Sequence, residues 1–333
     1  MHQIFKIILS ILLFCLFSFS AFADQASFAS WLENFKLQVQ KEGVSQKTIK
    51  NALTDIKFLP KVIEYDRYQP EFYEDTHTYI KKRSSKSKVK KGLTLYKKKK
   101  NLINTVEKKY SVEKELLLAL MGIETNFGNY LGKMDILSSL ATLSYDMRRR
   151  DFFTNELIVL LKLIDNEVVD HSTLYGSWAG AFGNFQFMPS TIKKYAIDYD
   201  GNKNIDLKNI EDSFASAANY INSIGWKNNE PCFIKVNLKN NIPKKFLNTS
   251  AKKIKNKNKI SFFAKFIKDD LNFLDKDFSV GIITPDKDIV PDSENLKPAY
   301  IVFENYELIL KWNRSLRFAL AVCTLKNKFI NEI

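Results

Sequence analysis

The sequence has 333 residues, of which 45% are hydrophobic, and this is enough to bury a large core arranged in two or three lobes. Its formal net charge is +14 at pH 7, with 51 Lys and Arg against 37 Asp and Glu, and this balance favours polyanionic partners. The histidines and cysteines have no zinc-ligand spacing, which excludes a zinc site.

The first 23 residues are typical of a secretory signal peptide. Lys6 precedes an apolar stretch, from Ile7 to about Phe19, that is shorter than the roughly 20 residues of a membrane span. An Ala-x-Ala cleavage sequence follows, and Cys15 lacks the small preceding residue that a lipoprotein cysteine requires. We therefore expect residues 1–23 to be cleaved and the remainder to be exported. The alternative is an uncleaved anchor.

Helical patterns dominate the chain as far as Trp226. The segment "FASWLENFKLQVQKEG" has a helical pattern that ends at Gly43, and Ser45 is expected to cap the next helix. Further helical patterns cover residues 137–143, 152–164 and 212–224.

A basic stretch runs from Lys81 to Lys100 ("KKRSSKSKVKKGLTLYKKKK"), and it leads into an amphipathic pattern that includes Ile103 and Val106. We interpret this stretch as a solvated helical face and loop. The alternative is electrostatic attraction to anionic polymers or lipids. A second basic stretch, residues 252–259, is expected to be a loop.

After Trp226 the pattern changes to short β-branched or aromatic runs that Asn, Pro and Asp separate. Four such runs, "PCFIKVNL", "ISFFAKFI", "FSVGIITPD" and "PAYIVF", predict a small β-rich lobe. The last segment, "NYELILKWNRSLRFALAVCTLKNKF", returns to a helical pattern. Cys232 and Cys323 could pair in an oxidising compartment, and the alternative is two buried thiols.

A glutamate at the end of an apolar helix is the strongest candidate for chemistry. The segment "SVEKELLLALMGIETNFGNYLG" places Leu116, Leu117, Leu120 and Ile123 on one apolar face, and Glu124 follows where the pattern stops. Partly apolar surroundings penalise the charged carboxylate and favour the protonated form that a general acid needs. The alternative is an ordinary exposed glutamate near a helix C-terminus.

Four ordered motifs resemble those of the lytic murein transglycosylase B family. They are "GIETNFG" at 122–128, "LATLSYDMRRRDFF" at 140–153, "GSWAGAFGNFQFMPST" at 176–191 and "AANYINSIGW" at 217–226. The resemblance implies a mainly α (α+β) fold, with a lysozyme-like helical catalytic core, a helical lobe and a small β-rich lobe. It implies that the protein cuts the glycan strands of peptidoglycan.

The resemblance and the patterns together divide the chain into five segments. We expect the signal peptide at 1–23, an N-terminal helical lobe at 24–104, the catalytic core at 105–228, the β-rich lobe at 229–303 and a C-terminal helix returning to the cleft at 304–333.

In the family that the chain resembles, one glutamate performs both proton transfers, and Glu124 stands at its position. It would protonate the oxygen that leaves N-acetylmuramic acid in the β-1,4 bond to N-acetylglucosamine. It would then deprotonate the sugar's own 6-hydroxyl, which closes a 1,6-anhydro ring without water. Ordinary glycosidases use two carboxylates, and Asp135, Asp146 and Asp151 are interpreted as structural. The alternatives are a hydrolytic muramidase and a non-catalytic peptidoglycan-binding scaffold.

The resemblance also implies a set of substrate-binding positions. Ser177 and Gln186 fall on positions that orient the carboxylate of the catalytic glutamate and the acetamido group of the substrate. Arg148 and Arg149 fall on positions near the lactyl group and peptide stem, where a guanidinium can bind a carboxylate bidentately. The full set is Ser177, Gln186, Arg148, Arg149, Tyr220, Asn313 and Trp178. Two positions depart from the family: Trp312 and Phe318 replace hydroxylated rings, which puts the contacts there in doubt.

The stretch 176–191 is rich in glycine and aromatic residues. Gly176, Gly180 and Gly183 let the backbone pass close to a sugar or adopt positive φ. The aromatic residues beside them, Trp178 among them, could stack on sugar faces, and the alternative is core packing. Pro189 suits the first turn of a helix.

The segment "DYDGNKNIDLKNIED" at 198–212 resembles a calcium loop that some members of the family carry. Its candidate ligands are Asp198, Asp200, Asn202, Asn204 and Asp212. It departs from the usual loop in two ways: Lys203 stands where the turn favours glycine, and Asn209 stands where glutamate is usual. The sequence therefore leaves calcium binding open, with a structural role if it occurs.

The expected partners are peptidoglycan glycan strands and proteins of cell-wall synthesis or turnover. A weak association with the anionic surface of the envelope is also expected, and nucleic acid is not. The chemistry requires no cofactor, and the expected location is the periplasm.

Overall fold

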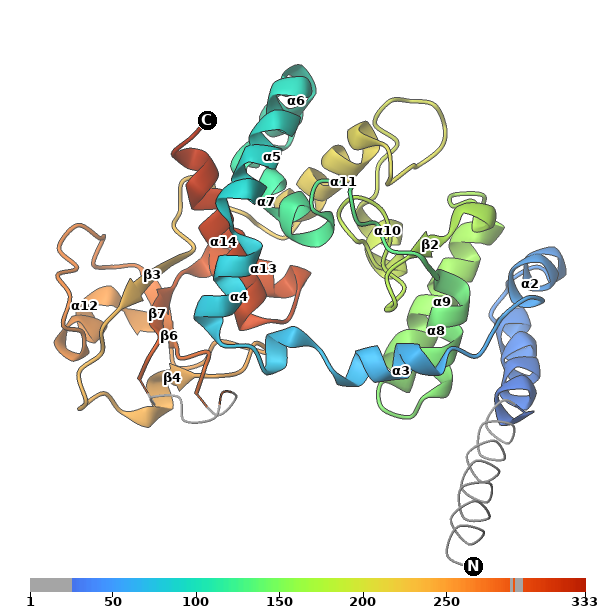
Figure 1. The fold of residues 1–333 in the computed structure, drawn as a ribbon, viewed down its shortest axis with the longest axis horizontal. Helices are drawn as coiled ribbons and strands as arrows, with labels where there is room; N and C mark the ends of the chain where they lie inside the picture. Colours follow the sequence, from blue (N-terminus) through green and yellow to red (C-terminus); the bar gives the residue numbers. More distant parts are fainter. Residues whose placement is uncertain (1–25, 288–289, 291–295) are drawn as a thin grey trace, which may run out of the picture. The chain divides into compact units, whose positions relative to one another are not determined.

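The computed structural model describes residues 26–287, 290 and 296–333 (Figure 1). The predicted signal peptide at 1–23, with Cys15, lies outside the described residues. Within them, the chain forms two compact units, each assembled from separate segments. The first unit contains the described residues up to Arg67, with Gly132–Phe182 and Phe187–Lys194, and the second contains Tyr68–Leu131, Gly183–Gln186 and Tyr195–Ile333. The predicted lobe boundaries, which are consecutive along the chain, stay a prediction.

The first unit is built mainly from helices. Its elements are a helix over 26–41, α2 (Gln46–Leu53), α3 (Pro60–Arg67), β1 (Met134–Asp135), α8 (Ile136–Tyr145), α9 (Arg150–Asp165), η2 (His171–Thr173), β2 (Tyr175–Gly176) and α10 (Pro189–Tyr195), whose last residue belongs to the second unit. Helix α8 packs against α9, and α2 and α3 pack against this pair.

Side-chain caps fix where two of these helices begin. The Ser45 hydroxyl accepts a hydrogen bond from the Thr48 N–H at 3.2 Å, which confirms the predicted cap of α2. The Asp135 carboxylate accepts one from the Ser138 N–H at 2.6 Å and so caps α8. Pro189 begins α10, as the sequence predicts.

The second unit contains the remaining long helices. They are α4 (Thr76–Arg83), α5 (Lys86–Lys98), α6 (Lys100–Tyr110), α7 (Lys114–Thr125), α11 (Ile210–Ser223), α13 (Glu304–Trp312) and α14 (Leu316–Ile330), and the short η1 (Pro70–Phe72) precedes α4. Helix α14 packs against α7, α4 and α13, and α11 packs against α6.

Helix α7 is more buried than its sequence pattern predicts. Leu116, Leu117 and Leu120 of the expected apolar face are buried, and so is every other residue from Glu115 to Gly122. Burial extends beyond one face because α14, α5, α6 and α11 all pack against the helix.

A small sheet forms the β part of the second unit. Its strands are β3 (Phe233–Val236), β4 (Leu247–Asn248), β5 (Asn258–Lys259), β6 (Ser279–Ile283) and β7 (Ala299–Val302). The order β3-β7-β6-β4 can be followed in Figure 1, with β5 paired to β6. Strand β7 lies antiparallel to β3 and β6, with Ile301 opposite Ile234 and Ile282, whereas β4 is parallel to β6.

One predicted strand is wrong. The run "ISFFAKFI" forms the helical turns α12 (Ile260–Phe263) and η4 (Ala264–Phe266), and η3 (Lys244–Phe246) lies nearby in the sequence. Ile260, Phe263 and Ile267 are buried in the core that lies against the sheet. Their spacing of three and four residues is helical, whereas a strand would bury alternate residues.

The C-terminal segment also differs from the prediction of a single helix. It forms two helices, α13 and α14, and the Ser315 hydroxyl caps the second by accepting the Phe318 N–H at 3.2 Å. Cys323 of α14 forms a disulfide with Cys232, with the two Cα atoms 6.1 Å apart. Of the two alternatives that the sequence left open, the structure has the pair.

The basic stretch at 81–100 lies on the end of α4 and on α5, where most of its lysines are exposed. Ile103 and Val106 of α6 are fully buried, so the amphipathic pattern that follows is confirmed. Among the helices of the described residues, none combines the length and the apolar composition that crossing a membrane requires.

Candidate active site

Glu124 lies one residue before the C-terminus of α7 and is half-buried. The helix ends sharply after it because Asn126, Phe127 and Gly128 all have left-handed backbone, with φ of 51°, 61° and 80°. The buried hydroxyl of Thr125 donates to the Asn184 carbonyl at 2.8 Å and so joins the end of α7 to residues 183–186. The sequence thus places the glutamate at a helix end that a hydrogen bond from Thr125 joins to residues 183–186.

Trp312, the last residue of α13, contacts the Glu124 carboxyl group directly. Its indole N–H donates to Oε1 at 2.9 Å, across 188 positions of sequence. The indole ring also stacks on Tyr220, with centroids 5.0 Å apart, and lies edge-on to Phe185 at 6.3 Å. The sequence left the contacts of Trp312 in doubt, so this partner was missed. The departure from a hydroxylated ring at this position was the available signal.

Tyr220 of α11 takes part in an aromatic cluster. It stacks on Tyr195 with centroids 4.4 Å apart as well as on Trp312, and its hydroxyl donates to the Lys311 carbonyl at 3.1 Å. Burial, with a smaller contribution from Tyr195, raises the pKa of Tyr220 to about 12. The ring therefore supports Trp312 in this structure, and Tyr220 remains protonated at neutral pH.

Gln186 and Asn313 are the other expected site residues in the second unit. The Gln186 amide donates to the Gly183 carbonyl at 2.9 Å and to the Leu131 carbonyl at 3.3 Å. Asn313 ends α13, where its N–H donates to the Ile309 carbonyl at 3.0 Å. Asn313 directly follows Trp312 in the sequence. Gln186 directly follows Phe185, whose ring meets Trp312 edge-on.

The remaining expected positions belong to the first unit. The Ser177 hydroxyl accepts the Ala181 N–H at 3.0 Å and closes a tight turn, and Trp178 is half-buried. The Arg148 Nε–H donates to the Asp66 carboxylate at 2.8 Å, and an Arg149 nitrogen lies 3.2 Å from the same carboxylate.

The paired arginines are anchored because Asp66 is almost fully buried. The Arg149 guanidinium also lies over the Phe153 ring, 4.5 Å from its centroid. Both guanidinium side chains keep part of their surface exposed, at 43% for Arg148 and 37% for Arg149. The exposed parts of the two guanidinium groups thus lie at the surface of the first unit.

The glycine-rich stretch is built mainly for packing. A side chain at Gly176 would meet the Ala181 carbonyl oxygen at 2.3 Å, and Gly183 has a φ of 80° and lies against Leu207. Phe182, Phe185 and Phe187 are buried, so core packing is confirmed for these rings.

The aspartates considered as second carboxylates occupy positions at helix ends or in an ion pair. Asp135 caps α8, as described above. Asp146 pairs with Arg67 at 2.7 Å, and Asp151 is exposed in the first turn of α9, where a negative charge is favourable. Phe318 is buried, so its position carries no exposed ring.

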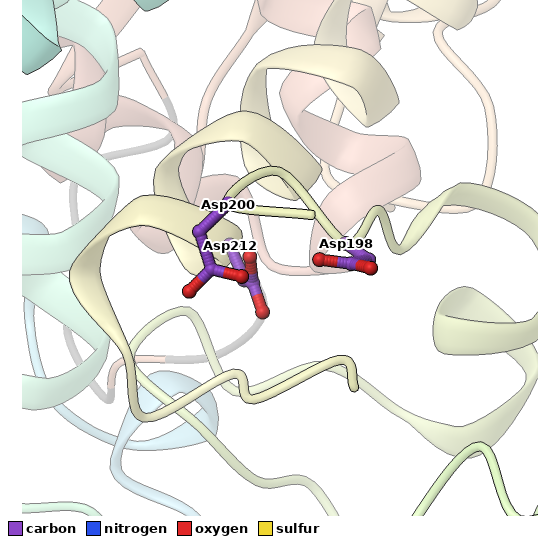
Figure 2. Close-up of side chains that lie close together, drawn as sticks. All are labelled: Asp198, Asp200 and Asp212. Carbon is purple, nitrogen blue, oxygen red and sulfur yellow. The ribbon is translucent and has the colours of Figure 1, made fainter. Parts of the chain in front are cut away.

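Three carboxylates of the loop at 198–212 lie together (Figure 2). Asp198, Asp200 and Asp212 each offer an oxygen within 4.8 Å of the others, and Asp212 is buried. Lys203 adopts a φ of 70° where the turn favours glycine. The Asn209 side chain caps α11 by accepting the Glu211 N–H at 3.0 Å. Asn202 and Asn204 are exposed, and the Asn204 N–H donates to the Asn202 side chain at 2.8 Å.

Hydrogen bonds within the loop hold its backbone around two of these carboxylates. The Asp198 carboxylate accepts the N–H groups of Gly201 and Lys203 at 2.8 Å each. The buried Asp212 carboxylate accepts the N–H groups of Tyr199 and Asp206, at 2.8 and 2.9 Å. The hard oxygen donors of this set suit calcium.

Comparisons with known proteins agree with these observations. A family model described as the Transglycosylase SLT domain matches residues 27–327. Membrane-bound lytic murein transglycosylase B of Escherichia coli (strain K12) is 38% identical over 149 residues. This match spans 44% of this chain and 41% of that protein, so the chain matches less than half the length of this curated relative.

Solved structures of lytic transglycosylases are similar over most of the chain. SltB3 of Pseudomonas aeruginosa, in complex with NAG-anhNAM-pentapeptide, has a TM-score of 0.78 and 28% identity, over 91% of this chain and 79% of that chain. The Escherichia coli lytic transglycosylase SLT35, in complex with calcium, has a TM-score of 0.73 and 27% identity, over 90% of this chain and 93% of that chain.

The expected fold class, a mainly helical lysozyme-like architecture with a small sheet, is confirmed by these neighbours. The four motifs that carried the resemblance, at 122–128, 140–153, 176–191 and 217–226, all lie inside the matched residues 27–327. Because this match covers far more than half of the sequence, the chain belongs to the transglycosylase SLT domain family.

Proposed function

We propose that this protein is a peptidoglycan lytic transglycosylase. It cleaves the β-1,4 bond between N-acetylmuramic acid and N-acetylglucosamine and forms a 1,6-anhydromuramic acid end. One observation carries the proposal: Glu124 lies half-buried at the end of the buried helix α7, with an indole donor 2.9 Å from Oε1, inside the matched domain. The complex of SltB3 with NAG-anhNAM-pentapeptide, a similar structure, supports this substrate class.

In the proposed reaction Glu124 acts first as an acid and then as a base. Its proton moves to the glycosidic oxygen while the bond from that oxygen to the anomeric carbon breaks. The carboxylate then removes the proton of the sugar's 6-hydroxyl as that oxygen bonds to the anomeric carbon. The substrate's own acetamido group stabilises the positive charge between these steps, so the two-carboxylate arrangement of ordinary glycosidases is not needed.

The proposed substrate contacts retain the expected set. Arg148 and Arg149, which Asp66 anchors, would bind the carboxylates of the lactyl group and the peptide stem. Gln186 and Ser177 would orient the acetamido group and the glutamate. The remaining proposed contacts are Trp178, Tyr220 and Asn313.

The proposal is tested by mass spectrometry of the soluble products from purified sacculi. Sacculi are incubated with the chain that begins at Asp24, with Glu124→Gln, and with Glu332→Gln, which changes an exposed carboxylate in the same unit. We expect anhydromuropeptides from the first and third proteins and none from Glu124→Gln. Circular dichroism spectra of the three proteins check that each is folded.

Two other outcomes assign the alternatives. Muropeptides with reducing ends from the unsubstituted chain would identify a hydrolytic muramidase. Binding to sacculi without any product would identify a peptidoglycan-binding scaffold. Either outcome contradicts a lytic transglycosylase.

We include a structural calcium ion in the proposal. Asp198, Asp200 and Asp212, with Asn202 and Asn204, would hold it, because these residues supply oxygen donors on one loop. The ion would fix the loop at the start of α11 and take no part in proton transfer. The calcium complex of SLT35, which is 27% identical, supports this part of the proposal.

The proposal places the protein in the periplasm, with residues 1–23 removed on export. Its partners there would be glycan strands and proteins of cell-wall synthesis or turnover, with weak association at the anionic envelope surface. Fractionation of cells that express the full chain, followed by N-terminal sequencing, tests this location. A new N-terminus at Asp24 in the periplasmic fraction is the expected result.

A further inference from the structure

We propose that Trp312 is a positioning residue for Glu124: its indole N–H fixes Oε1, so that Oε2 is the oxygen that carries and later recovers the transferred proton. The inference deepens the proposed function and rests on it. The observation behind it is the 2.9 Å hydrogen bond from Trp312 Nε1 to Glu124 Oε1.

The chemistry of the indole group makes this contact directional. An indole N–H can donate a hydrogen bond and cannot accept one, whereas a phenol or a serine hydroxyl does both. Oε1 is therefore an acceptor in both states of Glu124, as a carboxylate oxygen or as the carbonyl oxygen of the acid. The acidic O–H forms on Oε2. A hydroxylated ring in this place would allow the proton on either oxygen.

The proton balance of the reaction follows from this assignment. The Oε2–H bond breaks as its proton passes to the glycosidic oxygen, and the bond between that oxygen and the anomeric carbon breaks with it. Oε2 then accepts the proton of the 6-hydroxyl while the 6-oxygen bonds to the anomeric carbon. Glu124 ends protonated on the same oxygen, ready for another cycle, and Oε1 keeps its donor throughout.

Neighbouring rings hold the indole in place. Trp312 stacks on Tyr220 with an angle of 19° between the ring planes and meets Phe185 edge-on at 6.3 Å. Phe185 itself is buried against Phe214, with centroids 5.2 Å apart. An aromatic cluster of this kind restricts the side-chain torsions of the tryptophan, so the N–H keeps its direction.

Tyr220 also fixes the backbone that carries the indole. Its hydroxyl donates to the carbonyl of Lys311, the residue before Trp312, at 3.1 Å. Tyr195 stacks on the Tyr220 ring at 4.4 Å. The same tyrosine thus contacts both the ring and the backbone at the end of α13, which locates Trp312 more firmly than ring stacking alone.

The first test removes only the N–H group. Trp312 is replaced by a benzothienyl amino acid, in which sulfur takes the place of the indole N–H and the ring shape is kept, and separately by phenylalanine. With soluble uncrosslinked glycan strands as substrate, we expect kcat to fall about 10- to 100-fold in both variants, with KM unchanged, because the reacting carboxyl group loses its alignment. A benzothienyl variant with the kcat of the unsubstituted protein would overturn the proposal.

Trp226 supplies a matched control. Its indole N–H donates to the Glu113 carboxylate, at the other end of α7 and in the same unit. Trp226→Phe removes an equivalent indole–carboxylate contact about 16 Å along the helix. We expect it to keep its kcat. An equal loss of kcat in this variant would show that any such deletion disturbs α7 and would overturn a specific role for Trp312.

A second measurement does not depend on activity. The chain has four tryptophans, so its ¹H–¹⁵N spectrum has four indole signals, and Trp312→Phe and Trp226→Phe assign two of them. Glu124→Gln replaces the carboxylate by a weaker amide acceptor, so we expect the Trp312 signal to move upfield and the Trp226 signal to stay. An unmoved Trp312 signal would overturn the contact.

The two tests separate the inference from the function on which it rests. If the unsubstituted chain releases no products from sacculi, the proposed function fails, whatever the indole signals show. If it releases anhydromuropeptides and Glu124→Gln does not, but the benzothienyl variant retains full kcat, then only the role of Trp312 fails.

Discussion

At the scale of single residues, departures from the expected pattern have defined structural consequences. Trp312 replaces a hydroxylated ring and donates to Glu124. Lys203 stands in place of glycine, and its backbone still adopts the left-handed turn, with a φ of 70°. Asn209 stands where a calcium loop has glutamate, and it caps α11 instead. In each case the residue that departs from the expected pattern either adopts the backbone conformation of the turn or makes a hydrogen bond to a neighbouring polar group.

Glu124 could be predicted from sequence because its signal is local. The apolar run ends at the glutamate, and the left-handed residues that follow stop the helix there. Its contact with Trp312 could not be predicted, because the two residues are 188 positions apart and meet through the packing of α13 and the aromatic cluster. The anchoring of Arg148 and Arg149 by Asp66 is non-local for the same reason.

Lys88 gives a pH-dependent prediction at this scale. Its ammonium group donates to the Gly122 carbonyl of α7 at 2.6 Å. Burial, and then the nearby Arg83 and Lys91, lower the pKa of Lys88 from 10.5 to about 8. Between these values the unfolded chain binds more protons at this position than the folded protein. The free energy of unfolding contributed by Lys88 therefore rises as the pH increases from about 8 to 10.5.

The experiment compares urea unfolding of the unsubstituted chain and Lys88→Met from pH 7.5 to 10.5. Over this pH range we expect the free energy of unfolding of the unsubstituted chain to rise by about 1–2 kcal/mol relative to that of the variant. This value allows for solvent screening, because the group is only partly buried. Lys97→Met, an exposed lysine on the same helix, should follow the unsubstituted chain. The prediction is contradicted if the free energies of unfolding of the unsubstituted chain and of Lys88→Met differ by a constant amount across this range.

At the scale of elements, helices were predicted better than the β part. Ser45 and the apolar spacing gave α2, and the patterns at 152–164 and 212–224 correspond to α9 and α11. The prediction of a strand at 260–267 was wrong, because a short apolar run fits a strand and a helical turn alike. Packing of Phe263 against the sheet decides between them, and that contact is not visible in the run itself.

The loop at 198–212 gives a prediction at the element scale. Calcium that binds the folded loop stabilises the folded protein, so the unfolding midpoint should rise by a few degrees in calcium relative to chelator. Asp200→Asn should remove this rise, because it deletes an exposed carboxylate donor from the cluster. Lys203→Gly should enlarge it, since glycine adopts the positive φ without strain and the variant lacks a competing positive charge.

Thermal unfolding followed by circular dichroism, in calcium and in chelator, measures these shifts. Asp170→Asn changes an exposed carboxylate in the first unit and should respond to calcium as the unsubstituted chain does. Equal midpoints in calcium and chelator for the unsubstituted chain would rule out a structural ion in this loop.

At the scale of the whole molecule, segments that are distant in sequence assemble into each unit. The second unit takes Tyr68–Leu131, the short segment Gly183–Gln186 and the chain from Tyr195 onward. Local patterns carry no information about such an assembly, so the sequence supported only consecutive lobes. The four-residue segment brings Asn184 and Gln186 into the unit that contains Glu124, where Asn184 accepts a hydrogen bond from Thr125.

The disulfide of the second unit gives the prediction at this scale. Cys232 precedes β3 and Cys323 lies in α14, so the bond closes a loop of 91 residues that contains the whole sheet. A closed loop of this length restricts the unfolded chain, and its loss should lower the free energy of unfolding by about 3–5 kcal/mol. Glu124 and Trp312 make their contact without either cysteine, so products should still form from sacculi at temperatures where the variant is folded.

Guanidinium unfolding of the unsubstituted chain and of the double variant Cys232→Ala, Cys323→Ala measures the loss. Adding reductant to the unsubstituted chain should lower its free energy of unfolding towards that of the variant. The variant itself should not respond to reductant, because it lacks both cysteines of the disulfide. If reductant and the double substitution both leave the free energy of unfolding unchanged, the covalent link does not stabilise the unit. The long-range packing of α14 against α7, α4 and α13 would then have to hold the C-terminal segment in place without it.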